Sequence, residues 1–155
     1  FGRSIDVGGL EKERNILRYR PASTQVRGCA DAKLVDVARV VAAGLLAAGD
    51  NISVCLDPSL GEGLGRALRS VGVAVTTASD EDWYASLGAS RVRLVGGNPS
   101  RAADEADGDP DLALWANEVT SAPQVELLPF LREQSVSMTA HRFGNPDAGV
   151  LSVRL

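Results

Sequence analysis

Short runs rich in β-branched residues alternate with segments of helical periodicity through the middle of the chain. The runs that predict strands are residues 15–21, 24–29, 52–56, 73–77, 91–95 and 112–116. Helices are predicted for the residues that follow Asp31 up to Gly49, and for residues 63–71, 81–87 and 124–133. Because parallel strands need crossover connections that are usually helices, this alternation predicts an α/β fold. We expect three layers, with a mostly parallel sheet between two layers of helices.

Candidate capping residues, a proline and a polar stretch set the expected bounds of these elements. Asp31 is a candidate N-cap of the longest helix, and Ser79 or Asp80 is a candidate N-cap of the helix at residues 81–87. Pro129 would kink or end the helix predicted at residues 124–133 unless it lies in the first turn. Residues 98–111 are polar and acidic and are expected to form a loop.

The period of the apolar residues changes from helical to alternating near the end of the chain. Val136, Met138 and Ala140 form one alternating run, and Val150 and Val153 belong to another. The turn-rich residues 142–147 separate the two runs, so a β-hairpin is predicted. We therefore divide the chain into a linker or arm at residues 1–14, an α/β domain at residues 15–134 and a hairpin flap at residues 135–155. A two-stranded hairpin is marginally stable alone in water, so this flap is expected to need a partner surface.

Composition excludes several classes of function. The 155 residues suffice for one ordinary core, and 16 basic against 20 acidic residues give a net charge of −4. A chain of this charge has no electrostatic reason to bind nucleic acid or an anionic membrane. The longest apolar stretch is far shorter than the ~20 residues of a membrane span, so we expect no transmembrane segment. Two cysteines are too few for a disulfide framework, which favours a reducing, cytoplasmic setting.

The glycine-rich stretch Gly61-Glu62-Gly63-Leu64-Gly65 imitates a dinucleotide-binding motif. It lies between two predicted strands, and Asp80 follows about twenty residues later, as that motif requires. However, four residues separate the preceding strand from the first glycine, and Arg66 stands at the third glycine position. We therefore interpret the stretch as a loop entering a short helix, with nucleotide binding as the alternative.

A second stretch also matches a known motif in its spacing. The acidic residues Asp107, Asp109, Asp111 and Glu118 have the ligand spacing of an EF-hand calcium loop. The sixth position is Leu112 instead of the glycine that the sharp turn requires. A solvated acidic loop is the favoured interpretation, and no metal ligand is predicted.

Cys29 and His141 are the one conventional nucleophile and imidazole pair. Nearby Asp31 would raise rather than lower the pKa of the Cys29 thiol, so a buried, unreactive cysteine is expected. Trp83, Tyr84 and Trp115 are interpreted as packing residues, because no basic groove accompanies them. We predict no catalytic, cofactor-binding or metal-binding residue in this chain.

The stretch at residues 42–59 resembles the first Rossmann unit of the aldehyde dehydrogenase superfamily. Residues 42–51, which read Ala-Ala-Gly-Leu-Leu-Ala-Ala-Gly-Asp-Asn, lead into a strand and then into Asp57-Pro58-Ser59. In that superfamily the position of Asp57 is a lysine that binds the adenosine ribose of NAD. The Gly96-Gly97 pair lies where the superfamily has the segment that meets the pyrophosphate. The resemblance thus implies a Rossmann-like fold whose cofactor signatures are degraded.

The two ends of the chain resemble bacterial proline utilization A enzymes, which combine proline dehydrogenase with glutamate-semialdehyde dehydrogenase. Residues 13–21 are similar to the segment that leaves their catalytic dehydrogenase domain, and residues 125–144 are similar to their C-terminal end. In those enzymes the upstream domains use FAD and NAD, and an accessory domain helps to close the tunnel that carries the aldehyde. The resemblance implies a non-catalytic accessory domain that docks on a dehydrogenase domain of its own or a partner chain. The expected contact residues are Val136, Met138, Thr139, His141, Arg142 and Phe143.

Overall fold

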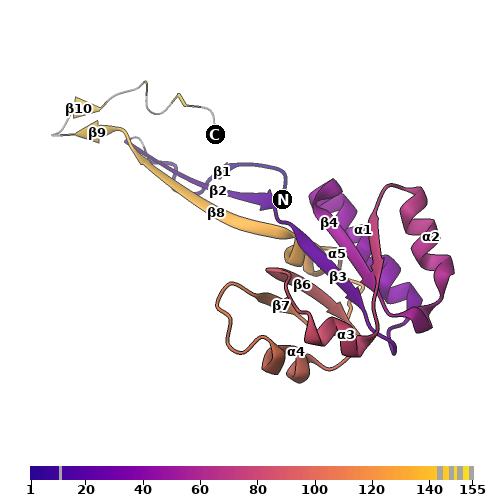
Figure 1. Cartoon of the computed structure of the whole chain (residues 1–155). Coiled ribbons are helices and arrows are strands. Elements are labelled where there is room, and N and C mark those ends of the chain that lie inside the picture. The colour runs from indigo at the N-terminus through magenta and orange to yellow at the C-terminus, as the bar shows by residue number, and fades with distance from the viewer. Residues whose placement is uncertain (11, 143–144, 147–148, 150–151, 154–155) are drawn as a thin grey trace. The chain divides into compact units, whose positions relative to one another are not determined.

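The computed structural model describes residues 1–10, 12–142, 145–146, 149 and 152–153, which form two compact units (Figure 1). One unit is Pro21–Leu131, and the other combines Phe1–Arg20 with Arg132–Leu155. We call them the α/β unit and the arm unit. The bounds of 1–14, 15–134 and 135–155 predicted from the sequence differ from this division, because residues 15–20 pair within the arm unit.

The α/β unit contains a five-stranded parallel sheet with the order β5-β4-β3-β6-β7. Its strands are β3 (Thr24–Gly28), β4 (Ile52–Leu56), β5 (Ala74–Thr77), β6 (Arg91–Val95) and β7 (Ala113–Trp115). All four strand pairs are parallel. The predicted α/β fold with a Rossmann-like parallel sheet is thereby confirmed.

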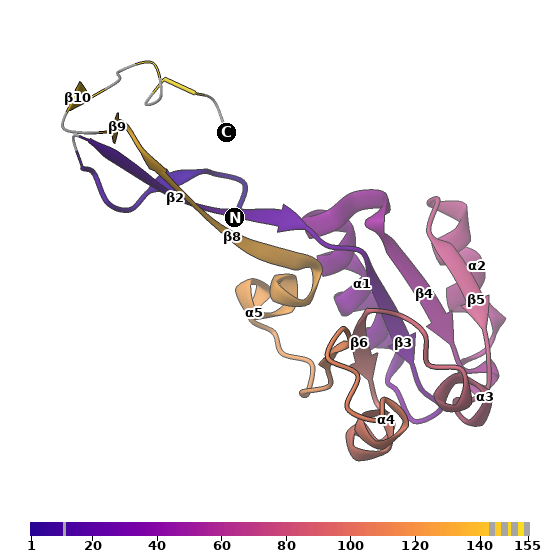
Figure 2. The same cartoon turned by 60° about the vertical axis from the view of Figure 1, so that its left-hand side comes forward.

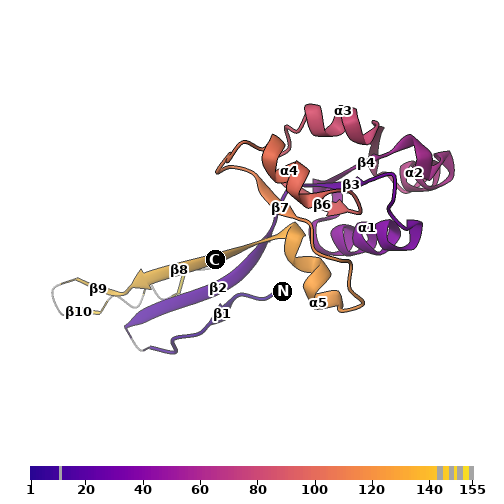
Figure 3. The same ribbon diagram turned by 90° about the horizontal axis from the view of Figure 1, so that it is seen from below.

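Helices cover both faces of this sheet (Figure 3). They are α1 (Leu34–Ala48), α2 (Glu62–Ser70), α3 (Asp80–Ala85), α4 (Pro99–Glu105) and α5 (Pro123–Leu127), with 3-10 turns η1 (Gly49–Asn51), η2 (Pro58–Leu60) and η3 (Leu128–Phe130). On one face, side chains of α1, α2 and η3 enclose a core that includes Val26, Val54 and Phe130. On the other face, α3 and α4 cover a second core around Cys55, Trp83 and Leu94.

The close contact between α1 and η3 depends on a helical glycine. Phe130 is fully buried, and a Cβ at Gly44 would lie 2.7 Å from its ring. Gly44 therefore allows the aromatic ring to pack directly on the α1 backbone.

Several predicted helix bounds are wrong for identifiable reasons. Asp31 does not cap α1, whose N-cap is Lys33, because the Asp31 carboxylate accepts the Gly97 N–H instead. The predicted loop at residues 98–111 contains α4, which Asn98 caps by accepting the Arg101 N–H. The helix predicted at residues 124–133 ends at Leu127, and the chain is a strand from Leu131 onward. Ser79 caps α3, as predicted.

The arm unit is built on a sheet with the order β1-β2-β8, whose strands are Ile5–Asp6, Glu13–Pro21 and Leu131–Thr139 (Figure 2). Segments from the two ends of the chain thus pair with each other. Beyond β8, the short strands β9 (His141–Arg142) and β10 (Asn145–Pro146) form an antiparallel pair around the predicted turn. The strand beside β8 is β2, whereas the sequence suggested residues 150–153; Val150 lies outside the described residues. Within the described ranges, no helix is both long and apolar enough to span a membrane.

Candidate functional site

Open parallel sheets with this strand order bind ligands outside the carboxyl ends of the strands, where neighbouring connections leave toward opposite faces. In this chain that place lies between β3, which is followed by α1, and β6, which is followed by α4. A cleft of about 440 Å³ lies there, and its lining includes Asp31, Lys33, Gly96, Gly97 and Glu118. The loops at this edge are therefore the candidate functional site.

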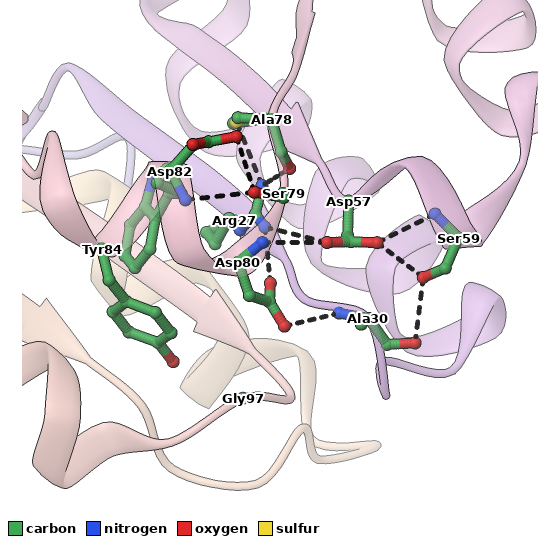
Figure 4. A network of polar contacts seen from close by, with 12 residues as sticks. Arg27, Ala30, Asp57, Ser59, Ala78, Ser79, Asp80, Asp82, Tyr84 and Gly97 are labelled. Carbon is green, nitrogen blue, oxygen red and sulfur yellow. Dashed lines mark hydrogen bonds and ion pairs between the residues drawn. The ribbon is translucent and has the colours of Figure 1, made fainter.

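A buried arginine organises the loops beside this cleft (Figure 4). The Arg27 side chain is completely buried, and its Nη2 donates to Asp80 Oδ1 over 2.5 Å. Its Nη1 donates to the Ala78 carbonyl at 3.0 Å and lies 3.2 Å from Cys55 Sγ. Burial disfavours the charge, but the hydrogen bond to Asp80 and the nearby thiols raise the pKa of Arg27 above its ordinary value. The guanidinium therefore stays charged and holds Asp80 in place.

Asp80 and Asp57 use their remaining oxygen atoms to accept backbone N–H groups. Asp80 Oδ2 accepts the Ala30 N–H at 3.1 Å, and Asp57 Oδ2 accepts the Asp80 N–H at 3.0 Å (Figure 4). Asp57 Oδ1 accepts from both the backbone N–H and the hydroxyl of Ser59. Burial would raise the pKa of Asp57, yet these hydrogen bonds lower it below the ordinary value. Asp57 thus belongs to an internal ionic network.

The Gly96-Gly97 pair packs against side chains of this same chain. Both glycines have positive φ angles, and the Gly97 N–H donates to Asp31 Oδ1 at 2.6 Å. A Cβ at Gly96 would lie 2.5 Å from Asp31 Oδ1, and one at Gly97 would lie 2.5 Å from Cys29 Sγ. Glycine is required at both positions by internal contacts.

These contacts decide what the edge of the sheet can bind. Backbone N–H groups at the ends of such strands hold the phosphates in dinucleotide-binding folds. Here, carboxylates of Asp31, Asp57 and Asp80 already accept from N–H groups of the loops. Their negative charges would also repel a phosphate. The arrangement therefore disfavours a pyrophosphate at this place.

The glycine stretch at residues 61–65 lies at the beginning of α2. Gly61 precedes the helix with a φ of 77°, whereas Gly63 and Gly65 lie inside it. The turn η2 separates β4 from Gly61, as the four intervening residues indicated. Asp80, which matched the acidic position of the dinucleotide motif, is held by Arg27 and the Ala30 N–H.

The Cys29 thiol is not activated as a nucleophile. Cys29 is completely buried, and burial together with nearby Asp80 raises its pKa to about 12, despite the opposing effect of Arg27. Such a thiol stays protonated and unreactive at neutral pH. Cys29 belongs to the α/β unit and His141 to the arm unit, and the side chain of His141 lies outside the described residues.

The aromatic and acidic candidates have structural roles. Trp83 and Tyr84 are buried, and Trp83 Nε1 donates to Gln25 Oε1 at 2.8 Å, whereas Trp115 is partly buried in β7. In the acidic loop, Asp109 Oδ1 accepts the Asp111 N–H, and Asp107 has a positive φ. Within the part of the chain that the structure describes, no group of three or more His, Cys, Asp or Glu side chains could hold a metal ion.

Polar contacts between β2 and β8 join the two strands of the arm unit. Arg18 Nε donates to Gln134 Oε1 at 2.6 Å, and the Tyr19 hydroxyl donates to Glu133 Oε2 at 3.0 Å. Farther along, Ser137 Oγ lies 2.8 Å from Asn15 Oδ1.

The predicted contact residues are unevenly described. Val136 and Met138 are half-buried and Thr139 is exposed on β8. His141 and Arg142 form β9, but their side chains and the whole of Phe143 lie outside the described residues. Their role in docking stays a prediction.

Two buried arginines that fix the loops, Arg27 and Arg93, were not predicted from the sequence. Arg93 on β6 forms a buried ion pair with Glu126 on α5, with 3.0 Å between Nη2 and Oε2. Arg93 Nη1 also donates to the carbonyls of Trp115 and Asn117, at the loop that leaves β7. A charged residue within an apolar central strand is rare, and that pattern was the available signal.

Comparison with known proteins gives a structural relationship only. No protein-family model matches the chain, and no curated protein matches its sequence. Among solved structures, the chain is similar to proline utilization A from Corynebacterium freiburgense, with a TM-score of 0.50 and 26% sequence identity. The match covers 93% of this chain and 12% of that one. The chain therefore has a fold related to part of that protein and spans a small fraction of its length.

Proposed function

We propose that this chain is a non-catalytic, aldehyde-dehydrogenase-like accessory domain of a bifunctional enzyme that oxidises proline to glutamate. In this proposal FAD and NAD serve upstream catalytic domains of a cytoplasmic protein, and the chain itself binds neither cofactor. The arm unit docks on the catalytic dehydrogenase domain and helps to close the tunnel that carries the aldehyde intermediate. Support comes from the similarity to proline utilization A over 93% of the chain.

The single observation that carries the non-catalytic assignment is that loop N–H groups at the edge of the parallel sheet already donate to carboxylates of the same chain. The ion pair of Arg27 with Asp80 places an acidic group where a phosphate would otherwise approach the β3 loop. The residue at the place of the ribose-binding lysine is Asp57, which lies 3.6 Å from Arg27 Nη2. Each of these groups stabilises the fold by contacts within the chain, so a catalytic role is not needed to explain its presence.

Docking of the arm unit is supported by the small core of its sheet. Within the described part of the arm unit, the buried apolar residues are Ile16 and Ala140, whereas Ile5, Val7 and Leu10 are each more than half exposed. An antiparallel sheet with so little buried apolar surface gains stability by packing on another surface.

The test uses the longer protein in which this chain is the proposed accessory domain. Val136→Asp combined with Met138→Asp places charges on one side of β8. Ser135→Asp is the matched control, because it adds a charge to the opposite side of the same strand. We expect the double variant to delay glutamate formation from proline and to release aldehyde into solution, while each separate oxidation keeps its rate. Coupled turnover without a delay would contradict the proposal.

The alternative function is a nucleotide-binding regulatory module, which the 440 Å³ cleft at the edge of the sheet favours. Its candidate residues are either residues 61–65 or Gly96 and Gly97, of which the two glycines line the cleft. Calorimetry with NAD and the 155-residue chain separates the two functions. Binding tighter than about 1 mM, equivalent to about −4 kcal/mol, would favour the regulatory module.

A further inference from the structure

The outward side of α1 is almost entirely apolar. Its exposed residues are Leu34, Val35, Ala38, Arg39, Ala42, Leu45 and Leu46. In a helix with 3.6 residues per turn these positions fall within an arc of about 140°. We call them the outer α1 face. Leu46 is 79% exposed and Val35 is 60% exposed.

The outer α1 face carries no unpaired charge. Arg39 is its one charged residue, and Arg39 Nη1 lies 3.1 Å from Asp36 Oδ1 on the same helix. A surface without net charge neither attracts an ionic partner nor repels an apolar one.

A groove of about 290 Å³ adjoins the outer α1 face. Arg39, Ala42, Ala43 and Leu46 of α1 line one side, and Thr120, Ser121, Pro123, Glu126 and Leu127 line the other. The two charged residues among them are paired within the chain, Arg39 with Asp36 and Glu126 with Arg93. Figure 3 shows α5 beside α1 at this place. The groove is large enough to receive a leucine or aromatic side chain, the kind of residue that anchors protein contacts.

A helix with apolar residues on all sides is typical of a helix covered by protein on both sides. The inner side of α1 forms the core through Val37, Val40 and Val41. We propose that the outer α1 face and its groove form a second docking surface, which belongs to the α/β unit. A neighbouring domain of the same polypeptide covers it with uncharged, apolar side chains. This inference rests on the proposed function, in which the chain is one domain of a longer protein.

The size of the surface favours a tethered domain over a second copy of the chain. The outer α1 face and the groove have far fewer than the roughly 20–30 residues per partner of a stable interface between separate proteins. A covalently linked domain acts at an effective concentration of about 1 mM or more, so a smaller contact suffices. In the similar proline utilization A, 88% (100% minus the matched 12%) of the chain lies outside the matched part, which is length enough for such a domain.

The test measures thiol labelling in the longer protein at two introduced cysteines. Leu46→Cys probes the docking surface, and Val71→Cys is the matched control, because Val71 is 66% exposed at the end of α2. Both cysteines of this chain are buried, and labelling is read by mass spectrometry on the peptide that carries each introduced cysteine, so cysteines elsewhere in the longer protein do not contribute. With a maleimide reagent, we expect Leu46→Cys to react at least about tenfold more slowly than Val71→Cys, at every protein concentration.

Equal labelling rates at the two positions would overturn the inference. Protection of Leu46→Cys that grows with protein concentration would also overturn it, because the covering partner would then be a second copy. The proposed function can fail separately. If charges on β8 leave coupled turnover unchanged while Leu46→Cys stays protected, the arm does not seal a tunnel but the surface on α1 is still covered by a domain of the same polypeptide.

Discussion

Removing Asp80 should destabilise the chain more than removing its partner Arg27. The Arg27 side chain is 0% exposed, whereas the Asp80 side chain is 28% exposed. After Asp80→Ala the guanidinium stays buried without its main counter-charge, and breaking such a pair costs about 3–5 kcal/mol. Asp57 Oδ2 remains 3.6 Å from Nη2 and offsets part of the loss. We expect a decrease of about 3 kcal/mol in the free energy of unfolding, at the low end of that range.

Arg27→Met should lower the free energy of unfolding by about 1–2 kcal/mol, because it removes hydrogen bonds but leaves carboxylates that still have other partners. Asp80 then keeps the Ala30 N–H and gains hydration through its exposed side, and the methionine fills part of the space of the arginine. Glu81→Ala is the matched control, because Glu81 is the next residue and its ion pair with Arg101 lies at the surface, so little change is expected.

Urea denaturation followed by tryptophan fluorescence measures all three variants. Trp83 is a suitable reporter, because its ring lies 5.4 Å from the Arg27 guanidinium. If Asp80→Ala costs no more than Arg27→Met, the ionic network is not organised by the buried arginine and the reasoning is refuted.

Two further predictions concern packing and pH. Gly44→Ala should lower the free energy of unfolding by about 1–3 kcal/mol, because the added Cβ would lie 2.7 Å from the Phe130 ring. Gly63→Ala in α2 is the control: its Cβ meets no atom within 4 Å, so the free energy of unfolding should rise by about 0.5 kcal/mol. Equal shifts of the two denaturation midpoints would contradict this account of Gly44. Burial raises the pKa of Cys29 from 9.0 to about 12, so the unfolded chain loses the thiol proton at lower pH than the folded chain. Its contribution to stability is therefore complete below pH 9 and decreases as pH rises from 9 toward 12. The free energy of unfolding measured across that range should fall less steeply in Cys29→Ala, and an unchanged slope would show that the thiol is not the titrating group.

The periodicity of the sequence was sufficient to predict the α/β architecture. β-branched runs such as Ile52–Leu56 are strands, and the apolar spacing from Leu34 onward gives α1. Such patterns are local consequences of which side chains face a core, so they are visible in the sequence. The prediction missed α4, because a short exposed helix has little apolar periodicity.

Pairing between distant segments could not be predicted from local patterns. The alternation at residues 136–140 indicated a strand but did not identify its neighbour, and β8 pairs with β2, more than a hundred residues away. Strand pairing depends on which edges meet after folding, and no local sequence pattern encodes that choice. The same reason explains why Leu131 begins a strand where helical spacing of apolar residues continued.

The sequence by itself determined the fold class, the degraded dinucleotide motif and the absence of charge that would attract nucleic acid. Only the tertiary structure decided which groups the loop carboxylates contact at the edge of the parallel sheet. Arg27, Asp57 and Asp80 are separated by 23 to 53 residues along the chain, and their contacts arise because parallel strands bring their carboxyl ends to one edge. There, a buried charge must find a partner of opposite sign, and the chain supplies it from its own loops.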